Sequence, residues 1–71
     1  MTPDNHLIEI LDVTIETFRG EIIGKTFLFA DDTSVSIDIY TNEVYDMDGI
    51  GSVSKAKKKA IENKINRKIT I

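Results

Sequence analysis

Most of this chain alternates between apolar and polar residues, and this alternation restricts the fold more than any other feature. A period of two is the spacing of a β-strand with one buried face. Four segments are rich in isoleucine, valine, threonine and aromatic residues, and the alternation is clear in 11–18 and 35–40. The four segments are 7–18, 21–30, 35–40 and 43–47. The residues between them are typical of turns: 19–20, 31–34 and 41–42. Because short turns join antiparallel neighbours, the sequence predicts a four-stranded antiparallel meander.

The pattern changes after residue 48. Gly49 and Gly51 interrupt the alternation, and isoleucines then recur every fourth residue, which predicts one α-helix over about 53–68. Ser52 or Ser54 is the expected N-cap. With 71 residues, the chain is expected to form a single small α+β domain over 1–71, in which the C-terminal helix packs on one face of the sheet.

The three turns together predict how side chains divide between the two faces of the sheet. One face would be aliphatic: Leu11, Val13, Ile15, Ile22, Leu28, Ala30, Val35, Ile37, Ile39 and Val44. Gly24 would also lie there, where the helix comes close. The other face would carry all five aromatic residues and several acids: Asp12, Glu16, Phe18, Phe27, Phe29, Asp38, Tyr40 and Tyr45. A single helix covers a single face, and the sequence leaves open which one it covers.

Large aromatic side chains on an uncovered sheet face are typical of a protein interface. We therefore expect these eight residues to bind a partner, so that the protein acts as a non-catalytic interaction module. Negative potential favours a basic partner, for example a nucleic-acid-binding protein inhibited by carboxylates that occupy its phosphate sites. A homodimer formed through the same face is the other version of this hypothesis.

Charge is distributed unevenly, which supports an alternative function. Residues 1–53 hold eleven acids and two bases, whereas 54–71 hold one acid and seven bases. The alternative is a nucleic-acid-binding protein that uses the basic helix: Lys55, Lys57, Lys58, Lys59, Lys64, Arg67 and Lys68. A pI near 4.9 argues against it. The simpler interpretation is that these bases pair with acids of the sheet, with Asp46 and Asp48 as the nearest candidates.

The sequence contains only weak signals of a catalytic or metal site. The absence of cysteine excludes disulfides and thiolate sites. The segment 46–51 begins like a calcium loop, but Ile50 and Lys57 stand where oxygen ligands are needed. Asp31 and Asp32 are ordinary turn residues, and His6 is isolated. We expect no enzyme activity, metal, cofactor or small-molecule substrate. No apolar run is long enough for a membrane span, so a cytoplasmic protein is expected.

Overall fold

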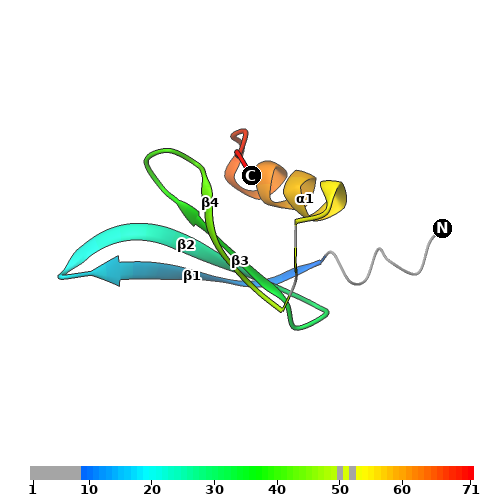
Figure 1. Cartoon of the computed structure of the whole chain (residues 1–71), viewed down its shortest axis with the longest axis horizontal. Helices are drawn as coiled ribbons and strands as arrows, with labels where there is room; N and C mark the ends of the chain where they lie inside the picture. The colour runs from blue at the N-terminus through cyan, green and yellow to red at the C-terminus, as the bar shows by residue number, and fades with distance from the viewer. Residues whose placement is uncertain (1–8, 50, 52) are drawn as a thin grey trace.

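The computed structural model describes residues 9–49, 51 and 53–71. Its elements, in chain order, are β1 (Ile10–Phe18), β2 (Glu21–Phe29), β3 (Ser34–Asp38), β4 (Val44–Asp48) and α1 (Lys55–Ile65). The four strands form an antiparallel sheet in the order β1-β2-β3-β4. Figure 1 shows α1 on one side of this sheet, with the turn end of the β1–β2 hairpin extending away from it. The predicted α+β meander with one C-terminal helix is confirmed.

Local hydrogen bonds at the end of β3, and the backbone conformation at the end of α1, explain why both elements are shorter than predicted. β3 ends at Asp38 because its Oδ1 accepts from the backbone N–H groups of Tyr40 (2.7 Å) and Thr41 (3.1 Å), which turns the chain. The helix ends at Ile65 because Asn66 adopts φ 60°, a left-handed conformation that closes a helix.

The helix begins after Ser54, whose Oγ accepts from the backbone N–H of Lys57 at 3.2 Å. Ser54 is therefore the N-cap. The other candidate cap, Ser52, lies outside the described residues, as do His6 and residues 7–8 of the first predicted strand.

The turn between β1 and β2 has the predicted length of two residues. Arg19 and Gly20 both have positive φ, at 53° and 82°, which is the requirement of a tight hairpin turn of this type. Thr17 pairs with Ile22 across it, as predicted.

A β-bulge in β2 then reverses the predicted faces. The register shifts at Ile23, so Ile15 pairs with Lys25 and not with Gly24. Successive side chains of a strand point to opposite faces, so one extra residue moves every later side chain of β2 to the other face. Phe27 pairs with Val13 and shares its face. The predicted separation of an aliphatic from an aromatic face was wrong for this reason.

The next two hairpins also differ from the predicted register. β3 was expected to place Ile37 opposite Leu28, but Ile37 lies opposite Lys25 and Val35 opposite Phe27. β4 was expected to place Val44 opposite Ile39, but Val44 lies opposite Ile37. The loop between β3 and β4 is longer than predicted, because residues 39–43 connect these strands where a two-residue turn at 41–42 was expected.

The helix covers the face that combines the central phenylalanines with aliphatic side chains. The buried core consists of Phe27, Phe29, Val35, Ile37, Ile61 and Ile69. Burying a side chain of this size stabilises the fold by about 1.5–3 kcal/mol relative to exposing it. The core therefore combines phenylalanines predicted for one face with aliphatic residues predicted for the other, whereas Leu11, Ile15 and Ile22 stay exposed.

A partly buried ion pair joins the start of α1 to the loop between β2 and β3. The Nζ of Lys57 lies 2.7 Å from Oδ2 of Asp31 and 2.7 Å from Oγ1 of Thr33. The same ammonium lies 5.1 Å from the centre of the Phe29 ring. The acid that neutralises this lysine is thus Asp31 and neither of the expected residues Asp46 and Asp48.

Candidate protein interface

The sheet face opposite α1 carries acids and hydroxyl groups in cross-strand rows. The rows, read from β1 toward β4, are Asp12, Leu28, Ser34 and Asp48; Thr14, Thr26, Ser36 and Asp46; and Glu16, Gly24 and Asp38. These rows contain five carboxylates and no base. We call this surface, together with Tyr45, the acidic face. Its two acids on β1 and its two on β4 lie about 14 Å apart, since neighbouring strands are about 4.8 Å apart.

Hydroxyl groups in the middle of the acidic face form a short hydrogen-bonded chain. Thr26 Oγ1 donates to Oε1 of Glu16 at 2.7 Å and lies 2.8 Å from Oγ of Ser36. A threonine hydroxyl has one hydrogen, so Ser36 donates to Thr26. This chain fixes the direction of the Glu16 carboxylate, which lowers the entropy that the side chain would lose on binding a partner.

Tyr45 lies over the centre of the acidic face, in space that Gly24 leaves free. A Cβ atom at Gly24 would lie 2.7 Å from the Tyr45 hydroxyl oxygen and 2.5 Å from the Ile37 carbonyl oxygen. Gly24 thus permits the approach of an aromatic ring on the acidic face, and not of the helix as the sequence suggested. Partial burial of the phenol, followed by the negative charge of Glu16, raises the pKa of Tyr45 above its ordinary value.

Substituting Gly24 with alanine should lower the free energy of unfolding by about 1–3 kcal/mol, because the new methyl group overlaps the Tyr45 ring and the backbone of Ile37. Urea unfolding followed by circular dichroism measures this change. Gly51→Ala is the matched control, since no atom lies within 4 Å of its added Cβ. Equal midpoints for the two variants would contradict the proposed packing of Tyr45.

The structure divides the eight residues predicted to bind a partner. Asp12, Glu16, Asp38 and Tyr45 lie on the acidic face. Phe18 and Tyr40 are exposed in or next to the turns, and Tyr40 is 76% exposed. Phe27 and Phe29 have no exposed surface, because the bulge in β2 turns them toward α1. They cannot contact a partner in this fold, and the prediction that they do is corrected.

Asp46 and Asp48 belong to the acidic face, although the sequence had assigned them to the helix lysines. Their spacing of two on a strand is the signal that could have placed them there, because alternate residues share a face. Asp38 differs from them, since its carboxylate accepts the two backbone hydrogen bonds that end β3. Its role in the structure is to form the loop.

The basic residues lie on the other side of the sheet, on α1 and the segment that follows it. Among the described residues, Lys57 alone of the seven forms an ion pair. The other six are at least partly exposed: Lys55, Lys58, Lys59, Lys64, Arg67 and Lys68. The helix dipole disfavours the lysines that begin α1, and the first turn contains no acid that would offset them. The six other bases and the five carboxylates of the acidic face thus lie on opposite sides of the sheet.

The other candidate sites of the sequence are explained by local structure. Within residues 9–49, 51 and 53–71, no three acids or histidines are positioned to hold a metal ion. Asp31 is engaged by Lys57 and Thr33, and Asp32 is exposed in the loop with φ 68°. Asp46 and Asp48 stand on β4 and do not converge in a loop.

Comparisons with known proteins add no relative. The chain matches no protein-family model, and searches of the curated proteins and of the solved structures gave no match. In the part of the chain that the structure describes, no helix has the length and apolar character required to cross a membrane.

Proposed function

We propose that this protein is a non-catalytic interaction module whose acidic face binds a basic protein surface. The observation that carries the proposal is the set of five carboxylates on an uncovered sheet face without a base among them. A surface whose charges all have the same sign speeds the encounter with an oppositely charged partner and selects against other partners. The hydrogen-bonded Glu16 and the half-exposed ring of Tyr45 supply fixed contacts at its centre.

A basic, nucleic-acid-binding protein is the partner class that this face fits best. The lysines and arginines of such a partner are arranged to meet phosphates, and the carboxylates on β1 and β4 offer them a comparable set of negative acceptors. The protein would then inhibit nucleic-acid binding by that partner, in the cytoplasm. Self-association through the acidic face is disfavoured, because a two-fold dimer would bring two such sets of carboxylates together.

The test is the affinity for a fluorescein-labelled decalysine peptide, measured by anisotropy at 50 and 200 mM salt. The double variant Asp46→Asn/Asp48→Asn should bind about tenfold more weakly at low salt, since each neutralised charge removes roughly 0.5–1 kcal/mol. The double variant Asp32→Asn/Glu43→Gln has the same net charge and alters exposed acids outside the face, so its affinity should change less than twofold. Equal losses would mean that net charge alone determines binding, and would overturn the proposal.

The second candidate function is nucleic-acid binding by the basic side of the molecule. It is favoured by the six bases that form no ion pair with any described residue and that lie away from the acidic face. Duplex DNA titrated over a salt series distinguishes it. If Lys59→Gln/Lys68→Gln reduces the slope of log K against log salt by about 2, those bases contact phosphates.

A further inference from the structure

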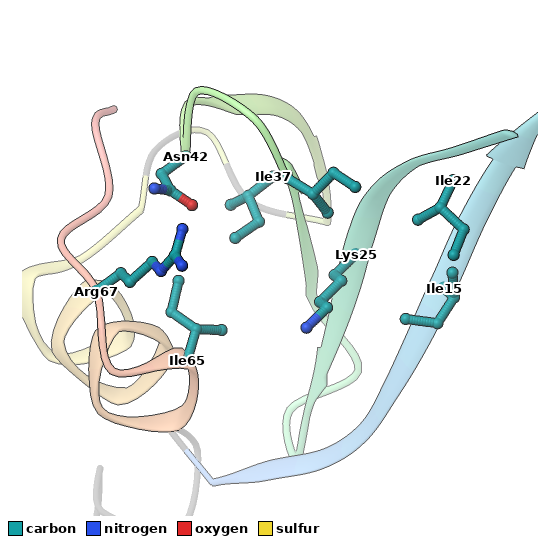
Figure 2. A pocket seen from close by; sticks show the side chains of 8 residues that line it. Ile15, Ile22, Lys25, Ile37, Asn42, Ile65 and Arg67 are labelled. Atoms are coloured by element: carbon teal, nitrogen blue, oxygen red, sulfur yellow. The ribbon is translucent and has the colours of Figure 1, made fainter.

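A second open surface lies on the helix side of the sheet, beyond the C-terminal end of α1. It is a hollow of about 420 Å³ lined by Ile15, Ile22, Ile65, Lys25, Asn42 and Arg67, with two further isoleucines of β3 and its loop. We call it the isoleucine groove. Figure 2 shows Arg67 and Asn42 on its helix side, Lys25 reaching in from the sheet, and Ile15 and Ile22 on the hairpin beyond.

The groove is open because α1 is shorter than the hairpin beneath it. β1 and β2 have nine residues each, which corresponds to about 30 Å, whereas the eleven residues of α1 span about 16 Å. Figure 1 shows the hairpin continuing past the helix. Ile15 and Ile22 point to the helix side but remain 46% and 47% exposed. This part of the apolar face is therefore left without a cover.

Two cations border this apolar surface. Lys25 stands in a cross-strand row between Ile15 and Ile37, on a face that is otherwise apolar in that row. Arg67 follows α1, and its backbone N–H donates to the Glu62 carbonyl, which holds the residue at the end of the helix. Neither side chain forms an ion pair with a residue in 9–49, 51 or 53–71. The groove thus combines aliphatic walls with two positive charges that the described chain does not neutralise.

We propose that the isoleucine groove binds an alkyl carboxylate. The carboxylate lies between Lys25 and Arg67, where the guanidinium can donate two parallel hydrogen bonds, and the alkyl chain follows Ile22 and Ile15 along the hairpin. A volume of about 420 Å³ falls within the range of small-molecule sites, which are mainly apolar with a few polar groups. This ligand class was not suggested by the sequence, and the site is independent of the acidic face on the other side of the sheet.

The test is a titration of the full chain with sodium decanoate below its micellar concentration, followed by methyl NMR. Saturable shifts of the Ile15 and Ile22 methyl signals are expected. Full burial of a methylene raises affinity about fourfold, so half-burial in an open groove should give about twofold per methylene. The four methylenes added from hexanoate to decanoate should therefore raise affinity about sixteenfold. Decyltrimethylammonium, which has the same chain and the opposite charge, should bind at least tenfold more weakly.

Variants separate the cations of the groove from general charge effects. Arg67→Gln and Lys25→Gln should each weaken decanoate binding about tenfold, whereas Lys55→Gln, at the far end of α1, should leave it unchanged. Equal binding of the two surfactants, or an equal loss in Lys55→Gln, would overturn the proposal. It would also be overturned if an acidic leucine-rich helical peptide shifted these methyl signals and decanoate did not, since the occupant would then be a protein segment.

Discussion

Replacing Phe27 with alanine is expected to lower the free energy of unfolding by about 3–5 kcal/mol, the usual cost of removing a buried aromatic ring. Phe27 has no exposed surface and lies between Val13 and Val35 under α1. At about 0.05–0.15 kcal/mol per residue, a chain of 71 residues has a total stability of about 4–10 kcal/mol. The substitution should therefore remove much of the stability, seen as a large decrease in the urea midpoint.

The control for this variant is the next residue along the strand. Leu28 points to the acidic face and is 37% exposed, so Leu28→Ala should cost about 1 kcal/mol or less. The two substitutions thus test the register of β2 directly. If Leu28→Ala were the more damaging of the two, the bulge at Ile23 and the assignment of faces that follows from it would be wrong.

Substituting Lys57 with alanine should have the second largest effect on stability, about 2–3 kcal/mol. The variant loses two hydrogen bonds made by a buried ammonium and the contact of that group with Phe29. Urea unfolding at pH 7 measures the change. Lys59→Ala, on the exposed side of the same helix, should change stability by less than about 0.5 kcal/mol. Similar values for both variants would show that the ion pair does not stabilise the start of α1.

The same ion pair predicts a dependence of stability on acid pH. The hydrogen bond from Lys57, then that from Thr33, lowers the pKa of Asp31 from 3.8 to about 2. A carboxyl whose pKa is lower in the folded state stabilises the fold above its unfolded pKa, and loses this contribution as pH falls. The urea midpoint should therefore decrease between about pH 4 and pH 2, and this decrease should be smaller in Asp31→Asn. An identical decrease in the variant would assign it to other acids.

The sequence predicted the negative charge of the candidate interface but not the full set of residues that form it. Asp12, Glu16 and Asp38 were correctly placed together on one face, because they alternate with apolar residues in strands, although the sequence left open which face the helix covers. The two phenylalanines were misplaced, because a single inserted residue in β2 cannot be read from the alternation around it. A strand with apolar residues at both parities, such as 21–30, is compatible with either face.

The contacts of individual lysines could not be predicted from the sequence either. The excess of bases after residue 54 is visible in the sequence, but the partner of Lys57 lies 26 positions earlier in a loop whose conformation depends on Asp32 at φ 68°. Lys25 is a comparable case, because its face depends on the bulge at Ile23 and not on the alternation of the residues around it. Only the observed register puts it beside Ile15 and Ile37, where it becomes part of the isoleucine groove.

The sequence by itself determined the number and order of the elements, the two-residue turn at Arg19 and Gly20, and the cap at one of two serines. These features depend on local interactions, such as alternation, backbone φ preference and side-chain hydrogen bonds within a few residues. Tertiary structure alone decided which residues form the core, which acid pairs with Lys57 and which part of the hairpin stays uncovered. Those outcomes depend on strand register and on the length of α1 relative to the sheet, because both bring together residues that are distant in the chain.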